Sequence, residues 1–387
     1  MFSNPNKMNY YARWALVGLM ALAVVASILL GATAQGRTAV RTALFLPQIL
    51  PAAPVKPLDL FTREPARLPI TYPLSEGEGS ADLYVPAFGE RHSAILLFLG
   101  VNPAGRDDPR VVGLADALAR TGVVVMIPWS ENMTQNKVTV SEVDDLVRAF
   151  QFLRSHESVN PEMVGMSGFC VGASLTLVAA QDPRIKESVR FVNFFGGYFN
   201  AEDLVKSVVT RSRYYGDTIE PWEPASLSIQ VVRTHLIQGI TDPEDRQLLE
   251  AHFLAGGTPV AAAESLVSSE AQTVYELLSD PTPTEADALI ESLSASIRGS
   301  LMGISPSTAI DQLEARVLIM HDREDRLVPS EESARLFEAL GEDSSVYYTE
   351  FAFFQHLDPT RPVSPPIYVR EGFKLFLHMY NVMRAIS

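Results

Sequence analysis

Short apolar runs alternate with amphipathic segments along most of this chain. Residues 93–100 and 123–129 show no polar face, which is typical of strands buried on both sides of a parallel sheet. Residues 108–122 and 139–156 instead repeat apolar side chains at helical spacing. Further strands are predicted at residues 81–87, 163–169, 189–197, 315–322 and 344–354, and further helices at residues 171–181, 330–340 and 368–385. This alternation predicts an α/β fold with a mostly parallel sheet and helices on both faces.

One long segment interrupts the alternation. Between Gly197 and Ala315 no clear buried strand occurs for more than a hundred residues, and a single crossover does not need that length. Residues 198–310 predict short helices with polar links, and they contain 16 acidic and 6 basic residues. We expect a helical cap inserted over the active site. A solvated domain with no catalytic role is the alternative.

The N-terminal part of the chain predicts a membrane segment. Residues 14–36 form an uncharged apolar run. This run is long enough to span a bilayer as an uncleaved signal anchor. The alternative is a secretory signal peptide that is cleaved near Ala34. Residues 1–13 are then a short tail, and the proline-rich residues 37–73 predict a linker to a domain at residues 74–387. Two basic residues lie on each side of the segment, so the positive-inside rule does not decide its orientation. We expect the simpler topology, in which the domain lies outside the cytoplasm.

Composition excludes several classes of function. The 387 residues have a formal net charge of -15, and such a surface repels nucleic acid backbones. The chain contains a single cysteine, which excludes an internal disulfide framework and a cysteine-based zinc site. No GxxxxGK[ST] loop is present. We therefore expect no metal or other cofactor.

The single cysteine, Cys170, lies where a predicted buried strand meets a helix. Ligands bind beyond the carboxyl ends of parallel strands, and a nucleophile there needs a very tight turn. Gly168 and Gly172 flank Cys170 at minus two and plus two, as the nucleophile elbow G-x-Nu-x-G requires. A buried, unreactive cysteine is the alternative. Ser167 is a weaker rival nucleophile, because Phe169 stands where its second glycine should be.

Two later loops supply a candidate acid and base. Asp325 follows the strand at residues 315–322, with Asp322 and Glu324 as competing carboxylates. His356 follows the last strand, so all three groups should meet at one edge of the sheet. We expect the backbone N–H groups of Val171 and Val101 to stabilise an oxyanion.

These motifs resemble those of the α/β-hydrolase superfamily and, within it, the dienelactone hydrolase family. The resemblance runs from about Ala81 to the C-terminus and rests on "GFCVGAS", "FFGGYF" and "HDREDRLVP". It implies a Cys-His-Asp triad that hydrolyses esters or lactones. The sequence departs from the family pattern at Ala173 and Asp322, where the family has glycine, and in the long insertion and the membrane segment.

The sequence therefore predicts a membrane-anchored hydrolase that acts on a small ester or lactone through an acyl-cysteine intermediate. An acyltransferase and a catalytically silent binding or assembly module on the same fold are the alternatives. Four aromatic residues are candidates for an acyl pocket: Trp129, Tyr214, Tyr215 and Trp222.

Overall fold

The computed structural model describes residues 30–50, 53–255, 265–341, 345–354, 356 and 361–386. An eight-stranded sheet forms its centre, in the order β1-β2-β4-β3-β5-β6-β9-β10. The pairs β1–β2 and β2–β4 are antiparallel, and the other pairs are parallel. The strands are β1 (Ala66–Pro73), β2 (Glu78–Val85), β3 (His92–Phe98), β4 (Val123–Trp129), β5 (Val159–Phe169), β6 (Phe191–Phe195), β9 (Arg316–Asp322) and β10 (Val346–Phe351). The mostly parallel sheet is as predicted.

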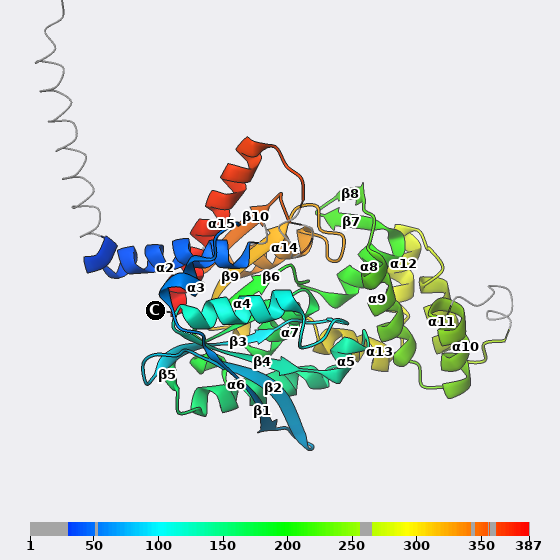
Figure 1. The fold of residues 1–387 in the computed structure, drawn as a ribbon. Coiled ribbons are helices and arrows are strands. Elements are labelled where there is room, and N and C mark those ends of the chain that lie inside the picture. The colour runs from blue at the N-terminus through cyan, green and yellow to red at the C-terminus, as the bar shows by residue number, and fades with distance from the viewer. Residues whose placement is uncertain are drawn as a thin grey trace, which may run out of the picture.

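Helices cover both faces of the sheet (Figure 1). Helices α2 (Ala34–Ile49), α4 (Pro109–Arg120) and α15 (Pro365–Ile386) share one apolar layer with Ile95 and Leu97 of β3. Helices α6 (Ser141–Ser155), α7 (Val171–Ala179) and α14 (Glu331–Leu340) share the other layer with Ala94 and Leu96. Successive side chains of a strand point to opposite faces, so an unbroken apolar run such as β3 has a core on each side.

The structure corrects the prediction of a linker at residues 37–73. Helix α2 packs against α15 and α4, and its Phe45 is fully buried. The short helix α3 (Pro57–Phe61) and the strand β1 follow within the same stretch. Prolines suggested an extended chain, but Pro57 starts α3, and Pro69 and Pro73 lie on an edge strand, two places where a missing N–H is tolerated. Pro47 lies inside α2.

The predicted membrane segment lies largely outside the described residues, at residues 14–29. Its last residues, 34–36, form the first turn of α2, and Ala34, the alternative cleavage position, is the first residue of that helix. Within the part of the chain that the structure describes, no helix has the length and apolar character needed to cross a bilayer.

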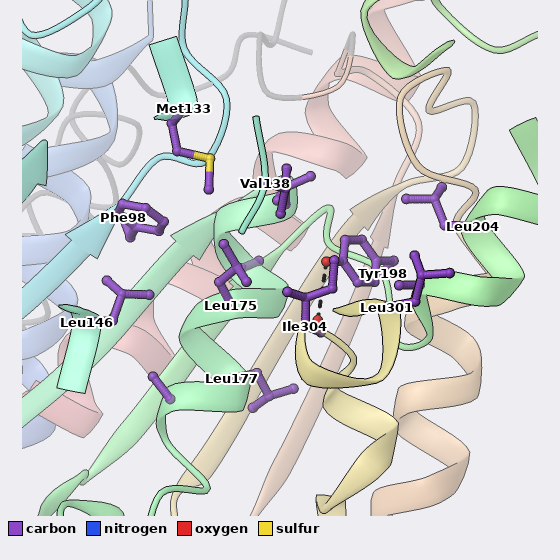
Figure 2. Close-up of a cluster of buried hydrophobic side chains, with 14 of the residues drawn as sticks. Phe98, Met133, Val138, Leu146, Leu175, Leu177, Tyr198, Leu204, Leu301 and Ile304 are labelled. Atoms are coloured by element: carbon purple, nitrogen blue, oxygen red, sulfur yellow. Dashed lines mark hydrogen bonds between the residues drawn. The ribbon is translucent and has the colours of Figure 1, made fainter. Parts of the chain in front are cut away.

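The insertion between β6 and β9 is mainly helical and lies to one side of the sheet, at the right in Figure 1. Its apolar side chains are continuous with those of the sheet layer: Leu301 and Ile304 pack with Tyr198, and Leu175 of α7 belongs to the same cluster (Figure 2). The first helix of the insertion is followed by a hairpin that was not predicted from the sequence. It pairs β7 (Ser212–Tyr215) with β8 (Thr218–Pro221). The helices are α8 (Ala201–Thr210), α9 (Ser226–Gln238), α10 (Pro243–Phe253), α11 (Ser269–Leu277), α12 (Pro283–Glu291) and α13 (Ala295–Gly303), and the four-residue α5 (Glu131–Thr134) precedes α6.

Candidate active site

Cys170 occupies a strained turn between β5 and α7. Its φ and ψ are 54° and -138°, a left-handed conformation that costs a non-glycine residue about 1–3 kcal/mol. The turn is fixed by its backbone, because Cys170 N–H donates to the carbonyl of Phe195 at 2.9 Å. The Cys170 carbonyl accepts from Ala173 N–H at 2.8 Å. Strain of this kind at the end of a central strand is a property of nucleophile elbows.

The flanking glycines are needed for close approach of the backbone. A Cβ on Gly168 would lie 2.4 Å from the Cα of Ala173, and a Cβ on Gly172 would lie 2.4 Å from the backbone N of Gly100. Neither neighbour is a flexible side chain that can move away. Both positions therefore require glycine, as the elbow motif predicts.

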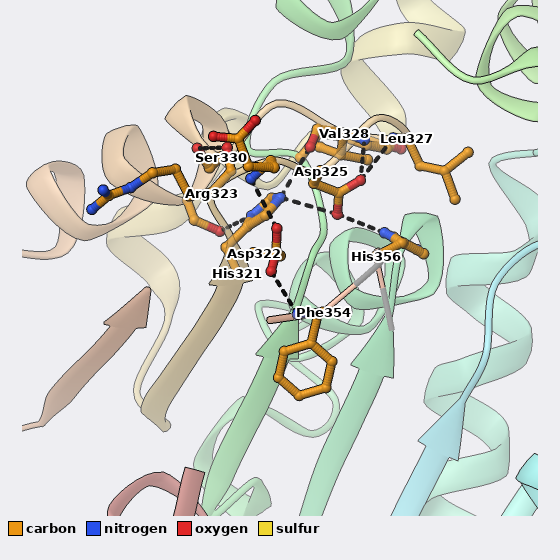
Figure 3. A network of polar contacts seen from close by, with 12 residues as sticks. His321, Asp322, Arg323, Asp325, Leu327, Val328, Ser330, Phe354 and His356 are labelled. Carbon is orange, nitrogen blue, oxygen red and sulfur yellow. Dashed lines mark hydrogen bonds and ion pairs between the residues drawn. The ribbon is translucent and has the colours of Figure 1, made fainter. Parts of the chain in front are cut away.

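The acid and base candidates meet beside this turn. Nδ1 of His356 donates to Oδ2 of Asp325 at 2.6 Å, while Oδ1 of Asp325 accepts from Leu327 N–H at 2.7 Å (Figure 3). The Nε2 atom of His356 is buried and has no aligned hydrogen-bond partner among the described residues. The Cys170 side chain lies close enough to the imidazole for its charge to act on it. The three predicted residues thus share one edge of the sheet.

The charges of these groups stabilise one another. Burial alone lowers the pKa of His356, but the charges of Asp325 and Cys170 outweigh it and raise that pKa well above the ordinary value. Burial alone raises the pKa of Asp325, and the neighbouring His356 and His321 overcome it and lower that pKa well below the usual range. The arrangement favours the protonated form of His356 beside an ionised Asp325.

Asp322, a competing acid in the sequence, has a different place. Its Oδ1 accepts from Glu324 N–H and its Oδ2 accepts from Phe354 N–H, both at 2.8 Å. It also pairs with Arg361 at 2.9 Å. Burial raises its pKa. Asp322 therefore joins the acid loop to the segment that leads to His356, a role that the sequence did not reveal.

His321 lies beneath the acid. Its Nε2 donates to the carbonyl of Val328 at 3.0 Å and is 3.5 Å from Oδ2 of Asp325. Its Nδ1 is 2.7 Å from the hydroxyl of Ser333. This fully buried imidazole supports the loop that carries Asp325.

Ser167, the rival nucleophile, belongs to a separate buried network. Its Oγ accepts from the amide of Asn193 at 3.1 Å, and Oδ1 of Asn193 accepts from Nε2 of His378 at 3.1 Å. Nδ1 of His378 is 3.0 Å from the hydroxyl of Thr349. Burial lowers the pKa of His378 to about 3, so the imidazole is neutral. Ser167 thus lies within the sheet and contacts no base at the turn.

The two predicted oxyanion donors lie on adjoining segments. Val171 N–H is at the N-terminus of α7, and Val101 follows Gly100, whose backbone approaches Gly172 closely. Within the described part of the chain neither N–H donates to a backbone carbonyl.

The four candidate aromatic residues are dispersed. Trp129 lines a cavity of about 580 Å³ together with Tyr72, Phe98 and Arg106, and Cys170 is not part of its lining. Tyr214 and Tyr215 lie on the hairpin β7–β8. Trp222 alone contacts the acid loop, where its indole N–H donates to the carbonyl of Asp325 at 2.8 Å.

Among the residues that the structure describes, no group of three or more His, Cys, Asp or Glu side chains is placed to hold an ion.

The strand order, together with a tight strand-to-helix turn that presents Cys170, defines the α/β-hydrolase class of folds. Within that class, the model of the dienelactone hydrolase family matches residues 117–210, which confirms the predicted resemblance to that family. The matched segment contains Cys170 and ends before Asp325 and His356.

Individual relatives are distant. A probable 2-oxo-3-(5-oxofuran-2-ylidene)propanoate lactonase from Bradyrhizobium sp is 30% identical over 89 residues, and the match covers 19% of this chain and 36% of that protein. An uncomplexed acylaminoacyl peptidase from Pyrococcus horikoshii has a TM-score of 0.49 at 14% identity and covers 84% of this chain and 42% of its own. A hyperthermophilic esterase from Pyrobaculum calidifontis has a TM-score of 0.43 at 14% identity and covers 85% and 86% of the two chains.

Proposed function

We propose that the protein is a hydrolase that cleaves a carboxylic ester or lactone with Cys170 as nucleophile, His356 as base and Asp325 as the orienting acid. The observation that carries the proposal is the 2.6 Å bond between His356 and Asp325, beside a cysteine held in an elbow. The lactonase named among the relatives supports the choice of an ester-type substrate.

The proposed reaction proceeds in two halves. The Cys170 thiolate attacks the carbonyl carbon, and the backbone N–H groups of Val171 and Val101 stabilise the oxyanion. The C–O bond then breaks, and the leaving oxygen takes the proton of the His356 imidazolium. In the second half His356 removes a proton from water, which attacks the thioester and releases the acid and the thiolate. Asp325 keeps the proton on Nδ1 of His356 throughout.

Intact-mass spectrometry after addition of p-nitrophenyl acetate to the full chain in mild detergent tests the proposal. We expect a transient acetyl adduct on the native protein, followed by product release, and no adduct on Cys170→Ala. An adduct that persists until an alcohol or amine is added would identify an acyltransferase. Absence of both adduct and turnover, with Cys170 also unreactive to an alkylating reagent near neutral pH, would identify a catalytically silent module.

We also propose that residues 14–36 anchor the protein in a membrane with the hydrolase domain outside the cytoplasm. The uncharged run supports the membrane anchor. The orientation is proposed from the simpler topology. Retention of the intact chain in membranes after alkaline carbonate washing, with the domain accessible to protease from outside, is the expected result. Release of a chain that begins near residue 35 would indicate a cleaved signal peptide.

A further inference from the structure

The insertion contacts the acid loop through a row of hydrogen bonds. The indole N–H of Trp222 donates to the carbonyl of Asp325 at 2.8 Å. Ala225 N–H donates to the carbonyl of Arg326 at 2.6 Å, and the Ser228 hydroxyl donates to the carbonyl of Leu327 at 2.7 Å. Three consecutive carbonyls of the acid loop therefore accept donors from residues 222–228 of the insertion.

A return bond closes this contact. The guanidinium of Arg326 donates to the carbonyl of Glu223 at 2.9 Å. Trp222 is itself held in place, since its backbone N–H donates to the carbonyl of Arg211 at 2.8 Å. Trp222 as a whole is only 8% exposed and belongs to the apolar cluster shared by the insertion and α7. Trp222 is thus a fixed support for the acid loop.

The contact with the insertion supports Asp325, the acid of the proposed triad. The Asp325 side chain is held by the N–H groups of Leu327 and Val328, at 2.7 and 3.3 Å, and by His356. The Asp325 main chain is held by Trp222, through its carbonyl. A buried indole N–H on a buried carbonyl orients a loop strongly, because losing the donor leaves the carbonyl unsatisfied.

We infer that Trp222 is a positioning residue, which fixes the main chain of Asp325 so that its carboxylate meets His356. This inference rests on the proposed function. It makes the insertion part of the catalytic machinery. The titratable groups that face the pair are His321 and Asp322 around Asp325, and Cys170 beside His356, while Tyr198 in turn faces Cys170. Trp222 carries no charge, so its effect on the pair comes through geometry.

The single cysteine of the chain gives a direct readout. Alkylation of Cys170 by iodoacetamide, followed from pH 4 to 10 in the full chain, reports the apparent pKa of the thiol, because the thiolate is the reactive form. The test variant is Trp222→Phe, which keeps an aromatic ring and removes the donor. The matched control is Trp129→Phe, which removes an indole donor to Asp82 at 3.0 Å, away from the acid loop.

If Trp222 positions the acid, Trp222→Phe slows alkylation at pH 6 by about three- to tenfold, since the apparent pKa of the thiol rises by about half a unit to one unit. The Trp129→Phe protein should stay within about twofold of the native protein. Ser228→Ala removes a neighbouring donor with little change in volume and should shift the profile in the same direction. This variant decides the matter if Trp222→Phe does not fold.

His356→Gln separates the two hypotheses. If it slows alkylation while Trp222→Phe and Ser228→Ala match the native profile, the positioning role is wrong and the triad stands. If His356→Gln leaves the profile unchanged, the proposed triad is wrong, and the positioning role falls with it. A lower melting temperature of Trp222→Phe with an unchanged profile would show a purely structural residue and would also overturn the inference.

Discussion

Nδ1 of His356 lies 2.6 Å from Oδ2 of Asp325, although the two residues are 31 positions apart and follow different strands. Strands β9 and β10 are parallel neighbours, so the loops after them leave the sheet at the same edge. The pair raises the pKa of the imidazole and lowers that of the carboxylate. Its consequences can be tested without knowledge of the substrate.

Replacing Asp325 by Asn should suppress the reactivity of Cys170 at low pH. Without the carboxylate, burial lowers the pKa of His356, so the imidazolium that stabilises the thiolate is lost. We expect alkylation by iodoacetamide at pH 6 to slow about tenfold or more, since one pKa unit corresponds to a factor of ten. An unchanged alkylation profile would mean that Asp325 does not act on the thiol through His356.

Ser167→Ala should leave acyl-adduct formation within about twofold of the native rate. Ser167 is 7% exposed and hydrogen-bonded to Asn193, so the change removes one neutral buried hydrogen bond and costs about 1 kcal/mol of stability. Intact-mass spectrometry with p-nitrophenyl acetate measures the adduct. Complete loss of the adduct from a folded variant would show that Ser167 is the nucleophile.

Gly172→Ala should destabilise the protein by about 3 kcal/mol or more, because the new methyl group would meet the backbone N of Gly100 at 2.4 Å. Gly113→Ala is the matched control. Gly113 lies in α4 with no atom within 4 Å of an added Cβ, so alanine should stabilise the helix by about 0.5–1 kcal/mol. Urea denaturation of both variants measures the difference. Similar stability of the two would show that the backbones at the elbow are not in close contact.

His378 should make the protein sensitive to acid. Its pKa in the folded protein is about 3, below the ordinary value of 6.5, so the unfolded chain binds the extra proton in the window between these values. Stability is therefore lost as the pH falls through that window, by about 1.4 kcal/mol per pH unit. His378→Gln keeps an amide donor for Asn193 and removes the titration. Its unfolding free energy should fall less steeply from pH 6 to pH 4 than that of the native protein, and an equal slope would contradict the assignment.

Asp322→Ala should lower the unfolding free energy by about 3–5 kcal/mol, since it leaves Arg361 and the N–H groups of Glu324 and Phe354 without their buried partner. Asp322→Asn keeps one acceptor oxygen and should lose less. Denaturation at pH 7 measures both. A loss of less than 1 kcal/mol in the alanine variant would show that the two loops are held by other contacts.

The elements predicted most successfully from the sequence are those in which local pattern and tertiary environment agree. The apolar runs of β3, β4 and β5 are buried on both faces, and the glycines around Cys170 meet backbone atoms that admit no side chain. In both cases the residue types that form the sequence pattern are the ones that burial or close backbone contact requires.

The residues that sequence reasoning missed depend on distant partners. Asp322 resembled a competing acid because its hydrogen-bond donor Phe354 and its ion-pair partner Arg361 lie more than thirty positions away. Trp222 showed nothing of its contact with Asp325, which lies 103 positions along the chain. The linker prediction failed for a related reason: the burial of Phe45 requires α15, at the other end of the chain.

The continuous apolar cluster shared by the insertion and α7 constrains how a ligand reaches Cys170. A lid that moves on a hinge needs an interface that can open without exposing much apolar surface. Here a hinge motion of the insertion would expose Leu175, Tyr198 and Leu301 to water together. Exposure of that much apolar surface costs several kcal/mol. We therefore expect ligand entry to depend on small local rearrangements at the rim of the site, with the insertion staying in place.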